Sequence, residues 1–493
     1  MEQDTPDRYR PLVNSYDVFD TLITRRCIDP KIIFAQVEKR ERVEGFARAR
    51  IEAEASLAGK GYNFDEIYLE LARQKGWSPQ MCGALKQAEI DVECANAIPI
   101  VDNLSKVRDG DLLVSDMYLD TKTIRRLLEQ CGLRRNVGLY VSANGKATGD
   151  IWPRLLQRFA IARHTGDNIQ NDKKGLEKFG IRCHLDRASA LLETEVWLTR
   201  NNLPEVALLC REARLSTRAN DHISRELMNL QTSLNCPMLL LASVRLMKLI
   251  SKNGLKKVLF SSRDGELWMK IFRRLAEIVG ANIETEYFYT SRLARTSPSE
   301  DYLRYAKACL SEDTLLLDLC GTGWSVEHLV KNVGMNGCPV FLFSRQLGID
   351  EYEKLAPTPK QCEFHSIIGP DERFNGGIFL EILNSAPYGS AVDVRYVDGI
   401  PMPILDEDQR PDSLIAYVED QHEAAAQFVA AMDRNGIGGI MRLDEGSVNR
   451  LAGSLARHAA AQGLLISVFL ANSIGEDKEV CERLGCPGVY AKG

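Results

Sequence analysis

The sequence predicts an α/β protein with a doubly wound parallel sheet, a second α/β domain and a helical C-terminal region. Strand-like segments alternate with amphipathic helical segments over the first 190 residues, and a second alternating unit begins near residue 251. The last part of the chain is largely Ala-rich and has a helical pattern. We therefore expect domains at 1–190 and 251–400, a helical connector at 191–250, and a mainly helical region at 401–493.

The strands of the first unit are short apolar runs that end in polar residues. They are LVNSYDVF at 12–19, DLLVSDMY at 111–118 and VGLYVSA at 137–143, and RHTGDN at 163–168 reads as the end of a fourth strand. The segment TKTIRRLLEQCG predicts a helix, because Ile124, Leu127 and Leu128 share one face and Gly132 can end the helix. Residues from about 26 to 105 are rich in Glu, Arg and Ala and have no strand pattern. We expect a helical insertion there.

Composition excludes several classes of protein. The net charge is −6 and no dense Lys/Arg block occurs, so a nucleic-acid partner is not expected. The longest apolar stretch, PMLLLASV, is far too short to span a bilayer, and the N-terminus has no apolar leader segment. The thirteen cysteines form no CxxC pair and predict buried thiols in a reducing compartment. We expect a cytoplasmic protein without a membrane partner.

Acidic residues, a hydroxyl and a lysine follow the strands of the first unit. Because the carboxyl ends of parallel strands lie at one edge of a sheet, these side chains should lie close together. Mg²⁺ prefers carboxylate and carbonyl oxygens, a carboxylate can attack phosphorus, and a lysine can neutralise the charge of both groups. The set predicts a magnesium-dependent site for a phosphorylated substrate; it consists of Asp17, Ser115, Asp116, Lys146, Asp167 and Asp172.

The motifs DVFDTL, LLVSD, a lysine and GDNIQND occur in that order and resemble the four motifs of the haloacid dehalogenase (HAD) superfamily. Most members of that superfamily are magnesium-dependent phosphatases with a Rossmann-like core. The resemblance covers roughly residues 10–190, and the helical insertion is similar to the C1 cap of the family. It implies an aspartyl-phosphate mechanism.

The resemblance also assigns roles to single residues. Asp17 matches the nucleophile, because Thr21 follows it by four residues as the motif requires. Ser115 matches the residue that binds the phosphate, and Lys146 matches the lysine that neutralises charge on nucleophile and phosphate. The implied metal ligands are Asp17, the backbone carbonyl of Phe19, Asp167 and Asp172.

One position departs from the phosphatase pattern. Phosphatases of this superfamily usually have a second aspartate two residues after the nucleophile, where it acts as general acid and base, and this chain has Phe19 there. Asp20 is the nearest candidate for proton transfer, although on an extended segment it would point the other way and it also suits a turn. His164 is expected to be a packed residue.

The second unit contains two turns with site character. LLLDLCGTGWSVEHL reads as a strand, a Gly-rich turn and a helix, and SSRDGELW reads as another strand-to-helix turn. The first turn resembles the Asp-x-x-x-Thr-Gly-x-Ser loop of phosphoribosyltransferases and, less closely, the glycine motif of methyltransferases; a purely structural turn is the third reading. The candidate residues are Arg263, Asp264, Asp318, Thr322, Gly323 and Ser325.

The sequence thus favours a magnesium-dependent hydrolase that acts on a small phosphorylated metabolite. Two alternatives remain open. One is a bifunctional protein whose second domain is a phosphoribosyltransferase, and the other is a binding or scaffolding protein with a degenerate HAD domain, which the presence of Phe19 favours. Neither the substrate nor the oligomeric state has a signal that can be recognised in the sequence.

Overall fold

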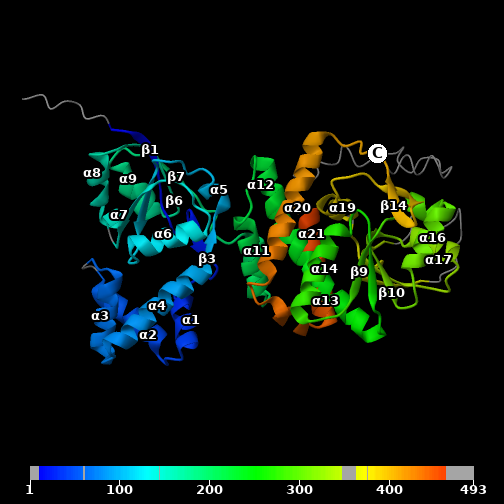
Figure 1. Cartoon of the computed structure of the whole chain (residues 1–493), viewed down its shortest axis with the longest axis horizontal. Coiled ribbons are helices and arrows are strands. Elements are labelled where there is room, and N and C mark those ends of the chain that lie inside the picture. Colours follow the sequence, from blue (N-terminus) through cyan, green and yellow to red (C-terminus); the bar gives the residue numbers. More distant parts are fainter. Residues whose placement is uncertain (1–9, 59–60, 144, 347–361, 375, 462–493) are drawn as a thin grey trace, which may run out of the picture. The chain divides into compact units, whose positions relative to one another are not determined.

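The chain folds into two compact units in the computed structural model (Figure 1), which describes residues 10–58, 61–143, 145–346, 362–374 and 376–461. The first unit comprises Met1–Leu191 with Leu215–Arg218. The second comprises Leu192–Arg214 and Ala219–Gly493. Each unit contains a parallel five-stranded sheet, so the predicted α/β class is confirmed.

The sheet of the first unit has the order β5-β4-β1-β6-β7, and all its strands run parallel. Strand β1 is central, which places the ends of β4 and β6 on either side of its own end. The short strand β7 extends the sheet beyond the segments predicted from the sequence. The strands are β1 (Leu12–Tyr16), β4 (Leu112–Asp116), β5 (Gly138–Ser142), β6 (Ala160–Gly166) and β7 (Cys183–Leu185).

Short helices connect these strands. The predicted helix α6 buries Ile124, Leu127 and Leu128, and Gly132 follows it with a positive φ of 98°, a conformation that favours glycine. The connecting helices of this unit are α5 (Val101–Leu104), α6 (Thr121–Gln130), α7 (Gly145–Thr148), α8 (Ile151–Leu156), the π-helix η1 (Ile169–Lys174) and α9 (Gly175–Glu177).

A helical insertion separates β1 from β4, as predicted. Figure 1 shows its helices as a bundle apart from α7, α8 and α9. The expectation that residues 26–105 contain no strand is wrong, because β3 (Ala97–Pro99) pairs antiparallel with β2 (Ile23–Arg25) where the chain leaves and re-enters the core. Such three-residue strands are too short to show a period of two. The inserted helices are α1 (Ile32–Glu41), α2 (Phe46–Leu57), α3 (Phe64–Lys75) and α4 (Pro79–Asn96).

The sheet of the second unit has the order β12-β11-β10-β8-β9 and is also parallel. The chain goes from β8 to β9 on one side and then to β10 on the other, so the topological switch point lies between β8 and β10. The strands are β8 (Lys257–Ser261), β9 (Glu284–Phe288), β10 (Thr314–Gly321), β11 (Pro339–Arg345) and β12 (Glu363–Ile368).

Residues 191–250 are helical, as predicted, and most of them belong to the second unit. Within the described part of the chain, one continuous helical stretch, His222–Asn253, is long and apolar enough to cross a membrane, but 89% of its most apolar window is buried, as in a core helix. The helices in this region are α10 (Glu193–Arg200), α11 (Pro204–Leu215), α12 (His222–Leu230), the π-helix η2 (Gln231–Asn235) and α13 (Cys236–Asn253).

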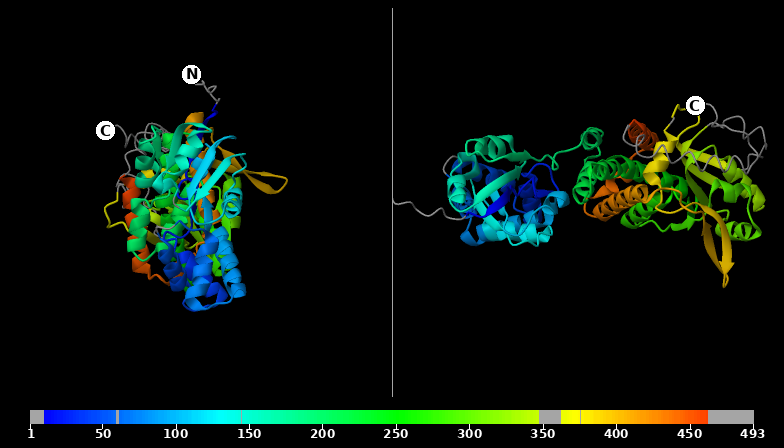
Figure 2. Two further views of the ribbon diagram at one scale, coloured as in Figure 1. Left: turned by 90° about the vertical axis from the view of Figure 1, so that its left-hand side faces the viewer. Right: turned by 90° about the horizontal axis from the view of Figure 1, so that it is seen from above.

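The rest of the second unit contains helices and one hairpin. The hairpin extends away from the other elements of its unit (Figure 2, orange), and it spans residue 400, the predicted boundary between the second α/β domain and the mainly helical region. Residues 462–493 of that region lie outside the described residues. The elements are α14 (Glu266–Val279), α15 (Arg292–Thr296), α16 (Glu300–Cys309), α17 (Trp324–Asn332), α19 (Gly377–Asn384), β13 (Ala391–Val397), β14 (Ile400–Leu405), α20 (Asp412–Met432), the 3-10 helix η3 (Ile437–Arg442) and α21 (Glu445–Ala460).

Candidate functional site

Asp17 lies directly after β1, at the carboxyl edge of the first sheet. Its backbone N–H donates to the carbonyl of Thr165 in β6 (2.8 Å), which fixes the chain where the strand ends. Its side chain is largely buried, since the residue is 7% exposed. The hydroxyl of Thr21 lies 3.5 Å from Asp17 Oδ2. The spacing of four residues therefore brings both side chains to one place.

Lys146 connects two of the predicted acids. It belongs to the short helix α7, where its backbone N–H donates to Asp116 Oδ1 (2.8 Å). Its side chain is 3% exposed, and Nζ lies 2.5 Å from Asp17 Oδ1 and 2.6 Å from Asp172 Oδ1. Asp116, at the end of β4, thus holds the lysine loop against this strand. The ammonium group is thus shared between two buried carboxylates.

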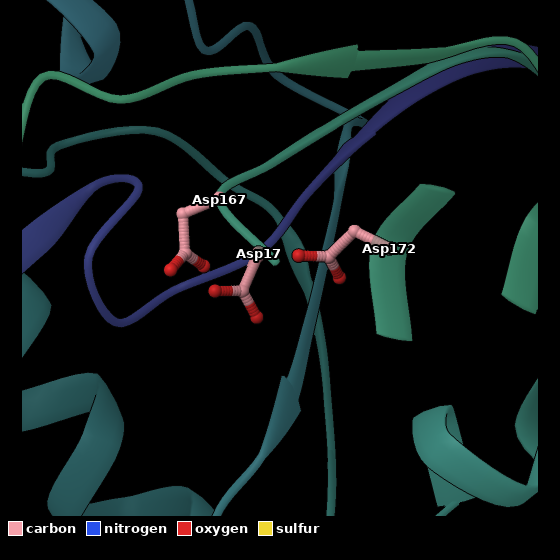
Figure 3. Close-up of side chains that lie close together, drawn as sticks. All are labelled: Asp17, Asp167 and Asp172. Carbon is pink, nitrogen blue, oxygen red and sulfur yellow. The ribbon is translucent and has the colours of Figure 1, made fainter. Parts of the chain in front are cut away.

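Asp167 and Asp172 come from the segment after β6. Asp167 follows the strand, and Asp172 lies in the π-helix η1, where its Oδ2 accepts the backbone N–H of Asn168 (2.9 Å). One carboxylate oxygen from each of Asp17, Asp167 and Asp172 lies within 4.8 Å of the other two. Figure 3 shows these side chains pointing toward one another. The three predicted acidic metal ligands are therefore brought together.

Among the described residues, this cluster has more acidic groups than basic ones. Burial raises the pKa of Asp17 to about 7 and the pKa of Asp167 to about 6, and neighbouring carboxylates add to both shifts. For Asp172, burial is outweighed by the hydrogen bond from His164 and the charge of Lys146, so its pKa is lowered. Three carboxylates face one ammonium group in this cluster. An added divalent cation would make the ionised state favourable.

The donor set fits Mg²⁺. Carboxylate oxygens are the ligands that this ion prefers, and it commonly combines one or two of them with water. The backbone bonds of the loop after Asp17 run from Asp20 N to Ile23 O and from Ile23 N to Val18 O, so neither bond uses the Phe19 carbonyl. Asp17, Asp167, Asp172 and that carbonyl are the atoms that would hold the ion.

A stability measurement tests this charge balance. In the folded chain, the pKa values of Asp17 and Asp167 exceed the ordinary value of 3.8, so the folded state binds more protons than the unfolded state. Without a cation, the folded state therefore loses stability as the pH rises from about 4 to about 7. Mg²⁺ should therefore raise the unfolding temperature more at about pH 8 than at about pH 5, where it competes with protons. Calorimetry with Mg²⁺ or chelator checks this. Asp167→Asn should reduce the Mg²⁺ effect, and equal shifts at both pH values would contradict the account.

Ser115 lies at the carboxyl end of β4, beside the end of β1, and is 2% exposed. The HAD resemblance assigns phosphate binding to a residue at the carboxyl end of the second strand of the unit, and Ser115 lies there. The parallel pairing of β1 with β4 brings this hydroxyl to the same edge of the sheet as Asp17. All the residues predicted for the first site therefore lie at one edge.

The side chain of Phe19 packs toward the helical insertion. The guanidinium of Arg25 lies over its ring, 4.7 Å from the centroid, and Arg25 forms two hydrogen bonds of 2.8 Å to Glu93 of α4. Both charged side chains are buried. Phe19 thus links the loop after Asp17 to the insertion through Arg25 and Glu93. The sequence does not reveal this, because Glu93 is 74 residues away from Phe19 along the chain.

Asp20 does not lie on an extended segment. The expectation that an extended backbone turns its side chain away from the site is therefore wrong. Its φ is 59°, in the left-handed region, and its Oδ1 accepts the hydroxyl of Thr24 (2.5 Å). After burial, the charge of Asp20 is the largest contribution that raises the pKa of Asp167. The turn therefore brings Asp20 within electrostatic range of the acidic cluster.

The second-unit candidates also gather at one sheet edge. Arg263 and Asp264 follow β8. Asp318 lies in β10, Thr322 and Gly323 precede α17, and Ser325 lies in its first turn, so the neighbouring strands β8 and β10 bring both turns together. The residue that sequence reasoning missed is Arg295 of α15. It is 5% exposed, and its NH1 donates to Asp318 Oδ2 (2.6 Å) while its NH2 donates to Ser261 Oγ (2.8 Å).

These contacts give the Gly-rich turn a structural role. Asp318, the acid of the phosphoribosyltransferase-like loop, is held by Arg295. The hydroxyl of Thr322 accepts the backbone N–H of Trp324 (3.1 Å), and a Cβ on Gly323 would lie 2.3 Å from the ring of Phe364. A glycine is therefore required at position 323 by packing and by its φ of 87°.

The chain matches no protein-family model, and no curated protein matches its sequence. Its chemistry is therefore inferred from the residues of the two units. The first site has the richer donor set, because it combines three carboxylates, a buried lysine and a buried serine at one sheet edge.

Proposed function

We propose that the first unit is a magnesium-dependent phosphohydrolase of the HAD type that acts on a small phosphorylated metabolite. The observation that carries the proposal is the contact of Lys146 Nζ with both Asp17 and Asp172, at 2.5 and 2.6 Å, beside the third carboxylate of Asp167. A buried lysine paired with acids at the carboxyl edge of a parallel sheet suits a phosphoryl group, whose negative charge needs cations. In this proposal, α1 to α4 form the C1-type cap.

In the proposed reaction, an oxygen of Asp17 attacks phosphorus and the bond from phosphorus to the leaving oxygen breaks. Lys146 and Ser115 bind the phosphoryl oxygens and keep Asp17 aligned. A bound Mg²⁺, held by the carboxylates and the Phe19 carbonyl, would neutralise charge on the phosphoryl group. Water then attacks phosphorus, which releases phosphate and regenerates Asp17.

The leaving oxygen needs a proton, and Asp20 is the group proposed to supply it. In the second step, the Asp20 carboxylate takes a proton from the attacking water, so the protons balance over one turnover. Asp20 is the proposed donor because its left-handed turn brings its carboxyl group within electrostatic range of Asp167. The hydroxyl of Thr24 donates to its Oδ1 and orients the carboxyl group.

Exchange of Asp20 tests this step. Asp20→Asn should lower the turnover of phenyl phosphate by about 10²-fold and change that of 4-nitrophenyl phosphate little, because the nitrophenolate leaves without a proton. The ratio of the two kcat values measures the effect. Asp29→Asn, at an exposed position of the following segment, is the control. An equal loss with both substrates would mean that Asp20 only maintains the loop.

Phe19 supports a second candidate function. The ring of Phe19 packs under Arg25 and joins the loop to the helical insertion. Phosphatases of the HAD type usually have an aspartate at this position. A domain that binds Mg²⁺ and a phosphorylated ligand without turnover would keep the same contacts. Turnover distinguishes the two functions, because both predict binding.

The test of the proposed function is a screen of purified protein against phosphate monoesters, including 4-nitrophenyl phosphate, with Mg²⁺ or with chelator. Release of phosphate that requires Mg²⁺ and stops on chelation supports the hydrolase. Mg²⁺-dependent binding of inorganic phosphate without any turnover would favour the binding protein instead.

A further inference from the structure

His164 is fully buried beside the acidic cluster and contacts it through Asp172. It lies in β6, where it is the direct cross-strand partner of Ser15 in β1. Its Nδ1 lies 2.8 Å from Ser15 Oγ, and its Nε2 lies 3.4 Å from Asp172 Oδ1. The ring of Trp152 packs edge-on against it, with centroids 5.2 Å apart. The imidazole is therefore held on three sides.

The hydrogen-bond directions follow from the chemistry of the partners. An ionised carboxylate can only accept, so the contact with Asp172 requires a proton on Nε2 of His164. The ammonium group of Lys146, which contacts the same oxygen, helps to keep Asp172 ionised. A neutral ring then has no proton on Nδ1, and the Ser15 hydroxyl must donate to it. The arrangement thus selects one tautomer.

This histidine also determines how Asp172 is oriented. Asp172 Oδ1 accepts from both His164 and Lys146, and Oδ2 accepts the backbone N–H of Asn168, so the carboxylate is fixed by three donors. Lys146 lies between Asp172 and Asp17. A continuous contact chain therefore runs from Ser15 through His164, Asp172 and Lys146 to Asp17.

We infer that His164 is a positioning residue of the proposed reaction. It holds Asp172 in the orientation that directs Lys146 at Asp17, and it does so as the neutral tautomer protonated on Nε2. The inference rests on the proposed function. Partners of this kind, one contact removed from a metal site, typically change metal affinity or activity by about 10- to 100-fold when they are removed.

Two exchanges separate positioning from packing. In His164→Gln, the amide nitrogen lies near the position of Nε2 and can still donate to Asp172. In His164→Asn, the amide lies near the position of Nδ1 and reaches only toward Ser15. Both leave a smaller side chain beside Trp152, so urea unfolding should show similar losses of stability. His184→Asn, at an exposed position of β7, is the matched surface control.

With 4-nitrophenyl phosphate as the probe, we expect His164→Asn to lower kcat and raise the Mg²⁺ concentration for half-activation, each by about tenfold, with little change in KM. His164→Gln should recover most of this loss. Equal kcat values for the two variants, measured where both remain folded, would overturn the inference.

A readout that needs no activity accompanies the kinetics. ¹⁵N NMR of histidine-labelled protein at neutral pH should show His164 with a bare Nδ1 and a protonated Nε2, with the signals assigned by their loss in His164→Gln. The opposite tautomer would overturn the inference. A protein that shows the expected tautomer but no Mg²⁺-dependent turnover would instead contradict the proposed function, so the two failures can be distinguished.

Discussion

Asp17→Asn should abolish Mg²⁺-dependent phosphate release, with a loss of at least about 10³-fold in kcat, because an amide cannot replace the attacking carboxylate. The exchange is nearly isosteric and removes one of three clustered acids, while Lys146 keeps its contact with Asp172. We therefore expect the variant to remain folded and, with chelator at about pH 8, to be at least as stable as the wild type, because burial disfavours an ionised Asp17.

The matched control is Asp150→Asn, an exposed aspartate before α8. Its kcat should equal that of the wild type under the same conditions. Steady-state kinetics with 4-nitrophenyl phosphate, together with thermal unfolding of all three proteins, separates chemistry from folding. Turnover by folded Asp17→Asn within about tenfold of the wild type would rule out nucleophilic attack by Asp17.

Lys146→Met should show the largest loss of stability, about 3–5 kcal/mol, because it removes the shared cation and leaves buried carboxylates without their partner. Methionine has a similar length, so packing changes little. The loss should be smaller at about pH 5 than at about pH 8, since Asp17 and Asp167 have raised pKa values and take up protons at the lower pH. Urea unfolding at both pH values measures this.

The same exchange should lower kcat by about 10²- to 10³-fold, because the cation proposed to bind the phosphoryl group is lost. Mg²⁺ should restore part of the lost stability, since it neutralises the same carboxylates. Lys174→Met, on the exposed side of η1, is the control for removal of a lysine. A folded Lys146→Met protein with wild-type stability at about pH 8 would show that the three acids need no cation.

The elements of the first site could be predicted from the sequence because its acids follow segments that alternate with helices, as the strands of a parallel sheet do. The placement of Asp17, Asp167 and Asp172 near one another follows from the rule that the carboxyl ends of parallel strands lie at one edge of the sheet. The neighbours of His164 could not be predicted, because its pairing with Ser15 depends on the register of β1 against β6. Periodicity does not reveal register between strands so distant in sequence.

Loop geometry and polar contacts between distant residues also could not be predicted from the sequence. The positive φ of Asp20 arises in a loop closed by its own bond to the Ile23 carbonyl. Arg295 holds Asp318 from a five-residue helix that has no motif of its own. The hairpin of β13 and β14 was missed, because Pro401 and Pro403 argue against a strand in a single sequence.

The central claim is that Asp17 becomes phosphorylated. It is tested most directly by acid quench of the protein during turnover of 4-nitrophenyl phosphate with Mg²⁺, followed by peptide mass spectrometry. The account predicts one phosphoryl group on the peptide that contains Asp17, absent with chelator and absent in Asp17→Asn. Phosphate release by the wild type with no phosphoryl group on that peptide, or with the group on another residue, would contradict it.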